Sequence, residues 1–114
     1  MLDLETLGTR PGCVILTIGA VLFDPYSLKE PGPGIYMRVN ADEQIALGRE
    51  VQEDTLQWWM NQADDIREEA LGEEGRVSVE QMYRELNKIC VGVTNIWAQG
   101  PVFDIAILEN IYRQ

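Results

Sequence analysis

Histidine is absent from this chain of 114 residues, and cysteine occurs only twice, at Cys13 and Cys90. Two cysteines cannot build a disulfide framework, and without histidine their spacing offers no zinc site. Both lie in apolar stretches, so we expect both to be small core residues of a protein in a reducing cytosol.

Basic residues are also scarce: 9 Lys and Arg stand against 19 Asp and Glu, for a formal net charge of −10. Proteins that bind nucleic acid along its length carry a basic surface that displaces counterions, so this balance argues against tight, extended binding to duplex. Divalent cations held by acidic side chains would invert the local charge where a phosphate sits. Nucleic-acid chemistry at a small metal site therefore stays open.

A secretory leader is not expected, because the first ten residues carry Asp3 and Glu5 and lack a basic start. The longest apolar run is far shorter than a membrane span. Hydrophobic residues make up 46% of the chain and charged residues 25%, which is ordinary for a folded soluble domain. We expect one cytoplasmic domain over residues 1–114, with no membrane partner.

The most apolar stretch, residues 14–23 (VILTIGAVLF), predicts a central strand covered on both faces, because both alternating sets are mostly apolar. One face would carry Val14, Leu16, Ile18, Ala20 and Leu22, and the other Ile15, Thr17, Val21 and Phe23. The Pro- and Gly-rich residues 29–34 predict a hairpin loop, and residues 35–39 (IYMRV) predict an antiparallel strand after it.

Two capping-box spacings indicate the starts of two helices. Asp54 precedes Gln57 by three residues, and Ser78 precedes Gln81 in the same way. Each pair leads into apolar residues at helical intervals, and a polar loop over residues 71–76 would separate the two helices.

A short strand over residues 94–98 (TNIWA) and a last helix running to the end of the chain complete the predicted elements. The apolar positions of that helix are Phe103, Ile107, Leu108 and Ile111. The predicted order is a first short strand at the chain start, the two strands described above, two helices, a further strand and a last helix. This order indicates an α/β fold with a mixed sheet flanked by helices.

Asp3 and Glu5 form the only acid-x-acid pair in the chain. In an extended segment, residues two apart point to the same face, so the two carboxylates would lie side by side. A divalent cation such as Mg²⁺ or Mn²⁺ would remove their repulsion. On spacing alone, a solvated pair near the chain start is an equally open interpretation.

Asp104 follows a Gly-Pro turn and an apolar pair, between the predicted strand and the last helix. It could simply cap that helix. Alternatively, it brings a third carboxylate to the mouth of the sheet, where open α/β folds place their ligands.

The adjacent Trp58 and Trp59 cannot face the same way on a helix. We expect one to pack into the core and the other to cover a groove or to stack on a nucleobase.

Together these motifs resemble the DEDD 3′–5′ exonuclease superfamily, which includes proofreading domains. Residues 2–24 resemble its first motif, Asp-x-Glu-Thr at the start of a β-hairpin, and residues 99–104 resemble its second, Asn-x-x-x-Phe-Asp. The closer resemblance is to the exodeoxyribonuclease VIII-like and phage-type branch, which has a Thr-x-x-Trp-Trp helix with a nearby Gln. Here that pattern is Thr55, Trp58, Trp59 and Gln62.

The resemblance implies an RNase H-like fold and two bound Mg²⁺ or Mn²⁺ ions. Asp3 would bridge both ions, while Glu5 and Asp104 would hold one each. Four further residues would contact the terminal nucleotide or wall its pocket: Thr6, Leu7, Gln99 and Phe103.

Two departures from the family pattern are visible. Gln99 stands where the second motif has Asn, and the third motif, which supplies a histidine or tyrosine and a final aspartate, is missing from these residues. The domain is thus expected to be incomplete at its C-terminal side, without its general base and fourth metal ligand.

The implied activity is hydrolysis of the 3′-terminal phosphodiester of single-stranded DNA or RNA, with DNA slightly favoured, releasing nucleoside monophosphates. The main alternative is a catalytically silent RNase H-like module used for binding or assembly. A Holliday-junction resolvase or an RNase H fits the motifs less well. A homodimer is also open, since an exposed tryptophan would favour one.

Overall fold

The computed structural model describes residues 1–23, 32, 34–93, 96, 98 and 101–114, with only the backbone at 101 and 102. Within them the chain forms an α/β fold of three strands and five helices. In chain order they are β1 (Leu2–Thr6), β2 (Ile15–Val21), β3 (Gly34–Arg38), α1 (Ala41–Ala46), α2 (Glu53–Met60), α3 (Asp64–Leu71), α4 (Val79–Ile89) and α5 (Pro101–Tyr112).

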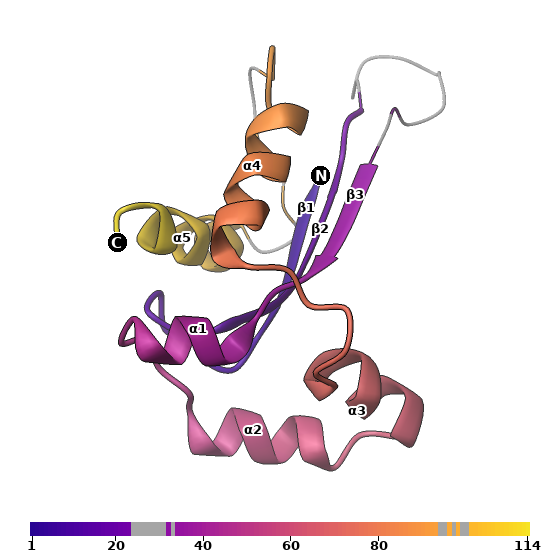
Figure 1. The fold of residues 1–114 in the computed structure, drawn as a ribbon, viewed down its shortest axis with the longest axis vertical. Coiled ribbons are helices and arrows are strands. Elements are labelled where there is room, and N and C mark those ends of the chain that lie inside the picture. The colour runs from indigo at the N-terminus through magenta and orange to yellow at the C-terminus, as the bar shows by residue number, and fades with distance from the viewer. Residues whose placement is uncertain (24–31, 33, 94–95, 97, 99–100) are drawn as a thin grey trace.

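The sheet has the order β1-β2-β3 with both pairings antiparallel, so β2 is central as expected (Figure 1). At the free side of β1, Ala98 makes a parallel bridge with Leu2. The described sheet itself is antiparallel, so the α/β class is confirmed, while this isolated bridge is a contact of the parallel kind that a mixed sheet would have. The predicted hairpin loop and most of the predicted 94–98 strand lie outside the described residues.

A bulge interrupts the alternation of β2. Glu5 pairs with Thr17, but Thr6 pairs with Ile15, so Leu16 is an extra residue on β2. Ile15 and Ile18 consequently pack into the same core cluster, whereas Leu16 packs into another. The predicted division of residues 14–23 is therefore wrong across the bulge, because one extra residue exchanges the faces on either side of it. Ile15 shares a face with Ile18 and Ala20, while Val14 and Leu16 lie on the other.

Two apolar clusters lie on opposite faces of the sheet. The larger packs α4 and α5 against one face, and the smaller packs α2 and α3 on the other (Figure 1). The larger cluster contains Leu2, Leu4, Cys13, Ile15, Ile18, Met37, Val39, Val79, Met82, Leu86, Ile107 and Ile111. The smaller contains Leu7, Val14, Leu16, Trp59 and Ala70. Burial on both faces is thus confirmed for residues 15–18, while the end of β2 is more open and Val21 is exposed.

Helix starts were predicted correctly at one capping box and wrongly at the other. The Ser78 hydroxyl accepts a hydrogen bond from the Gln81 amide at 3.1 Å, as a helix cap should. Asp54 is not the cap of α2; Gln52 occupies that position, and its side-chain oxygen accepts from the Thr9 and Arg10 amides and not from the helix. The Asp54 carboxylate instead accepts from the adjacent Thr55 amide.

Two helices were not predicted. The helix α1 begins after Asn40, whose side chain accepts from the Glu43 amide at 2.9 Å, and this capping pattern was present in the sequence. The helix α3 is separated from α2 by residues 61–63, so α3 occupies part of what the sequence suggested as one longer helical region.

The two cysteines differ in environment. Cys13 is buried, as expected, but Cys90 at the end of α4 is exposed, so its predicted core position is wrong. Cys90 continues the stripe of Met82 and Leu86, but it is the C-cap residue of α4, and residues 90–93 are all exposed because the chain has passed beyond the core there. Among the described residues, none of the helices has the length and apolar character needed to cross a membrane.

Candidate functional site

The two acids of β1 share one face of the sheet. Leu2 and Leu4 point into the larger cluster, so Asp3 and Glu5 point to the opposite face, where Asp3 is exposed and Glu5 is half-buried. The expected side-by-side placement of the pair follows directly from this alternation.

Each acid of this pair belongs to a row of three residues that runs across the three strands. Asp3 pairs with Gly19, which pairs with Tyr36, and Glu5 pairs with Thr17, which pairs with Arg38. Residues paired across antiparallel strands point to the same face, so each row places its members side by side.

The second row is covered by α3. Thr17 is only 4% exposed, and the Arg38 guanidinium donates to main-chain carbonyls at the C-terminal end of α3, those of Glu68, Glu69 and Gly72. Such bonds suit a cation at a helix C-terminus. The row through Asp3 lies beyond this cover and is open.

Asp104 lies in the first turn of α5, three residues after the helix begins, and its side chain is 5% exposed. It therefore does not cap the helix, and the interpretation of Asp104 as a simple cap is wrong. The helix α5 packs against β1, which brings its first turn toward the strand that carries Asp3 and Glu5.

The three acids influence one another. Burial raises the pKa of Glu5, and the negative charges of Asp3 and Asp104 raise it further. Burial also raises the pKa of Asp104, with an added contribution from the charge of Asp3. The charge of Asp3 reaches both Glu5 and Asp104, and the charge of Asp104 reaches Glu5, so the fold brings the three acids into one neighbourhood although about 100 residues separate them in the chain.

These acids supply hard oxygen donors, which suit Mg²⁺ or Mn²⁺. Among the residues that the structure describes, however, no three His, Cys, Asp or Glu side chains lie together closely enough to hold a metal ion. The acids therefore have the right chemistry for a divalent cation, but the described side chains do not form a complete set of metal ligands.

Thr6 and Leu7, expected to touch a nucleotide, make contacts inside the protein. The Thr6 hydroxyl donates to the Gly8 carbonyl at 2.7 Å, and the Thr6 carbonyl accepts from Trp59 Nε1 at 2.8 Å. Leu7 is buried in the smaller cluster. Their contact with substrate stays a prediction.

The remaining two predicted pocket residues differ in what the structure shows. Phe103 is half-buried against the larger cluster, at the start of α5 and next to Asp104. Gln99 lies outside the described residues. The role of each as a pocket wall is untested.

The tryptophan pair divides as expected. Trp59 is 7% exposed and ties α2 to the end of β1 through its bond to Thr6, while Trp58 is 56% exposed. The two rings meet edge to face with centroids 4.8 Å apart.

The sequence analysis did not single out Gly19 or Tyr36 as site residues. A glycine inside an apolar strand is a signal for close approach of a neighbour, and it could have drawn attention to Gly19. Nothing local marks Tyr36, because its place beside Asp3 depends on the register of three strands.

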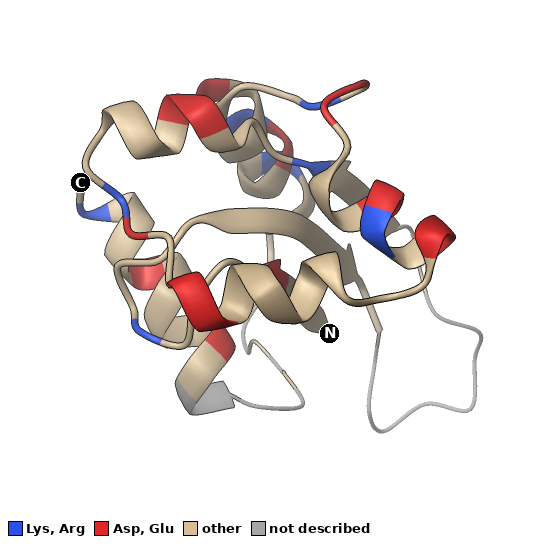
Figure 2. Cartoon of the chain, turned by 90° about the horizontal axis from the view of Figure 1, so that it is seen from below, with Lys and Arg blue, Asp and Glu red and all other residues tan. Residues whose placement is uncertain are grey.

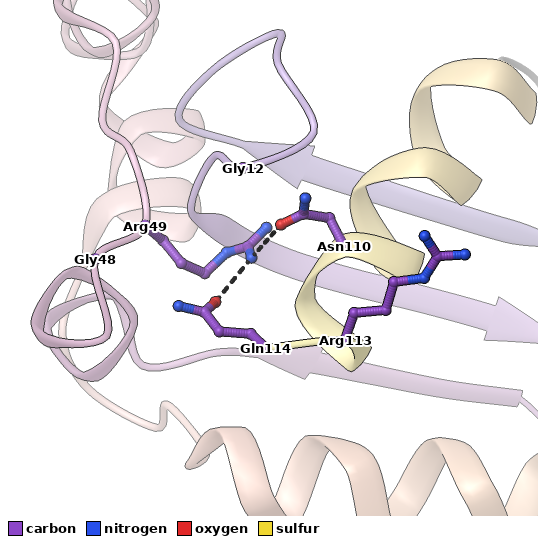
Figure 3. A pocket seen from close by; sticks show the side chains of 6 residues that line it. All are labelled: Gly12, Gly48, Arg49, Asn110, Arg113 and Gln114. Atoms are coloured by element: carbon purple, nitrogen blue, oxygen red, sulfur yellow. Dashed lines mark hydrogen bonds between the residues drawn. The ribbon is translucent and has the colours of Figure 1, made fainter.

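A second polar region lies at the other end of α5, where an open hollow of about 300 Å³ surrounds the Arg49 side chain (Figure 3). Arg49 is 5% exposed and donates to the Asn110 and Gln114 side-chain oxygens and to the Cys13 and Pro11 carbonyls, at 2.9–3.1 Å. None of the predicted site residues lines this hollow.

Charge is distributed over the whole molecule. Figure 2 shows acidic positions on several helices, with basic positions between them. All lysines and arginines within the described part of the chain are bonded internally, to carboxylates or to main-chain and amide oxygens. They are Arg10, Arg38, Arg49, Arg67, Arg76, Arg84, Lys88 and Arg113.

An α/β chain with acids on its first strand and in the first turn of its last helix belongs with the 3′–5′ exonucleases, and comparison with known families bears this out. The family described as the 3′-5′ exoribonuclease Rv2179c-like domain matches residues 1–114, and the chain belongs to this family. No curated protein matches the chain. The expected exonuclease assignment is thus confirmed at the level of the family, and the exodeoxyribonuclease VIII-like branch is not shown.

Proposed function

We propose that this protein is a metal-dependent 3′–5′ exonuclease that removes nucleoside monophosphates from the end of a single strand. The family description names exoribonucleases, so RNA is the substrate we propose first, in place of the slight preference for DNA expected from the sequence. A place in the exodeoxyribonuclease VIII-like branch would instead be supported by faster hydrolysis of DNA.

The observation that carries this proposal is the mutual effect of three acids. Asp3, Glu5 and Asp104 come from two distant segments; burial raises the pKa of Glu5, and the charges of Asp3 and Asp104 raise it further. Acids brought together in this way destabilise a fold unless something compensates their charge. Divalent cations compensate it and are the cofactors of phosphodiester hydrolysis at acidic sites.

In this proposal Asp3, Glu5 and Asp104 hold two Mg²⁺ or Mn²⁺ ions. When bound, such ions activate water and stabilise the leaving 3′ oxygen. The residues around them keep the acids in position. The Trp59–Thr6 hydrogen bond anchors the end of β1 to α2, and the regular pairing of Asp3 with Gly19 and of Glu5 with Thr17 keeps both acids on one face.

The test is hydrolysis of a 5′-labelled single-stranded RNA by the full-length protein with Mn²⁺. We expect progressive shortening from the 3′ end, and a loss of roughly 100-fold or more in rate for Asp3→Asn. Asp54→Asn, an exposed acid on α2, is the matched control and should keep the wild-type rate. Hydrolysis that survives Asp3→Asn would contradict the site assignment.

A silent binding module is the second candidate, and it is favoured by the lack of a closed ligand set among the described residues. Calorimetric titration with Mn²⁺ separates the two. For the exonuclease we expect binding heat that Glu5→Gln and Asp104→Asn both abolish. Heat that neither variant changes would favour the silent module.

A further inference from the structure

We propose that the space over Gly19, between Asp3 and Tyr36, binds the nucleobase of the strand's terminal nucleotide; we call this space the Gly19 slot. The inference rests on the proposed function and names the part of the substrate that this face of the sheet recognises.

The slot is defined by strand register. Asp3, Gly19 and Tyr36 form one transverse row, so their side-chain positions lie on the same face of three adjacent strands. Adjacent strands are about 4.8 Å apart, so β1 and β3 are separated by about 10 Å across this row. The central position carries no side chain, which leaves a gap between a carboxylate and an aromatic ring.

Within the described part of the chain, the space next to Gly19 is not filled. A Cβ atom built on Gly19 would meet no described atom within 4 Å. Asp3 and Tyr36 are both exposed, Tyr36 at 57%. In the next row, Thr17 is buried and Arg38 is bonded to α3, so the cover of α3 ends where the slot begins.

Tyr36 is a fixed wall of this slot. Its hydroxyl donates to the Glu69 carboxylate on α3, which anchors one end of the ring while most of the side chain stays exposed. An exposed aromatic ring held in this way has lost its conformational freedom before any ligand arrives. A flat, uncharged aromatic ring of a ligand is therefore suited to stack on it.

A nucleobase meets the chemical requirements better than a phosphate. Bases stack on aromatic side chains whatever their identity, which suits an enzyme that shortens strands of any sequence. The exposed lysines and arginines of the described chain are each paired with a carboxylate, and the net charge is −10, so affinity through phosphate contacts is limited. Stacking in the Gly19 slot would supply the affinity while the acids of β1 lie beside it.

The test compares two ligands that differ only by the base. Calorimetry with Mn²⁺ measures the Kd of the full-length protein for a nucleoside 5′-monophosphate and for ribose 5-phosphate. We expect the nucleotide to bind about tenfold more tightly. Tyr36→Leu, which removes the ring, and Gly19→Val, which fills the gap, should bring the two Kd values together.

Two controls separate the slot from general damage to the fold. Tyr36→Phe keeps the ring and should keep the tenfold ratio, and Gly12→Val places the same side chain on another glycine with free space around its Cβ position, in the turn between β1 and β2. Circular dichroism melting verifies that each variant is folded. If Gly19→Val does not fold, Tyr36→Leu decides the question alone.

The outcomes distinguish the slot from the activity. Equal Kd values in the wild type, or a ratio that neither Tyr36→Leu nor Gly19→Val lowers, would overturn the slot even if the protein shortens RNA. A tenfold ratio lost in both variants supports the slot even if no strand is hydrolysed, in which case only the proposed activity fails.

Discussion

At the scale of single residues, the protein contains one buried cation that has no carboxylate among its hydrogen-bond acceptors. Arg49 joins the turn between β1 and β2 to the last turn of α5 through four neutral oxygens. Burial lowers the pKa of this guanidinium, yet an arginine stays charged at any ordinary pH. Its main function is therefore to hold two distant segments together.

Replacing Arg49 by Met should lower the free energy of unfolding by about 2–3 kcal/mol, because main-chain carbonyls lose a charged donor inside the protein. Urea denaturation of the two proteins measures the difference. Arg10→Met is the control: its ion pair with Glu50 is exposed, so we expect a change below about 1 kcal/mol. Equal losses in the two variants would contradict a special role for Arg49.

The raised pKa of Glu5 predicts how the stability of the protein depends on pH. The folded pKa of this acid lies above its ordinary value of 4.5, so the fold favours the protonated acid. This stability is fully present below about pH 4.5 and is lost as the pH rises through the folded pKa. In metal-free buffer, Glu5→Gln should therefore melt about 2 °C higher than wild type at pH 7, with the gain disappearing near pH 4.

The control for this experiment is Glu74→Gln, an exposed acid in the loop after α3, which should leave the melting temperature unchanged. The decisive feature is the direction of the effect with the metal removed. A variant that melts below the wild type at pH 7 in chelator would show that Glu5 is stabilised in the fold and not strained by its acidic neighbours.

At the scale of elements, two similar sequence signals led to different structures. Ser78 and Asp54 each precede a glutamine by three residues, but only Ser78 caps a helix. The start of α2 is set instead by a contact outside the helix, since the Gln52 amide nitrogen donates to the Leu7 carbonyl at 2.8 Å. A tertiary hydrogen bond has overridden a local preference.

We expect Ser78→Ala to lower the free energy of unfolding by about 1 kcal/mol, because the Gln81 amide loses its acceptor. The matched variant Asp54→Ala should change it by less than about 0.5 kcal/mol, since Asp54 does not cap α2. Guanidinium denaturation followed by circular dichroism measures both. A larger loss for Asp54→Ala would show that the predicted capping box operates after all.

At the scale of the whole molecule, a net charge of −10 coexists with membership of an exonuclease family. Each described basic side chain has a carboxylate or another oxygen of the protein as its partner, and acidic residues outnumber basic ones 19 to 9, so little net cationic surface is left to neutralise phosphates. A small site that holds a strand end by cations and by stacking is consistent with such a surface.

This charge balance predicts a weak dependence on salt. At fixed Mn²⁺, the slope of log KM for single-stranded RNA against log NaCl concentration should be about 1, because few counterions are released on binding. Steady-state kinetics between 50 and 200 mM NaCl, a range of about fourfold, would measure it. A slope of about 6 or more would require a basic binding surface and would contradict this view of the protein.

The sequence by itself determined what depends on neighbours along the chain. The pairing of Asp3 with Glu5 on one face follows from strand alternation, and the start of α4 follows from the Ser78 cap. Burial of the first half of β2 follows from its mostly apolar composition. Each rests on interactions within a few residues, which the order of amino acids expresses directly.

Only the tertiary structure decided what depends on register and packing between distant segments. The bulge at Leu16, the exposure of Cys90 and the open row through Gly19 and Tyr36 have no local signature strong enough to specify them. The approach of Asp104 to Asp3 is of the same kind, because it results from the packing of α5 against β1. Such placements arise when the whole chain buries its apolar surface at once, and they put the acids and the slot beside each other.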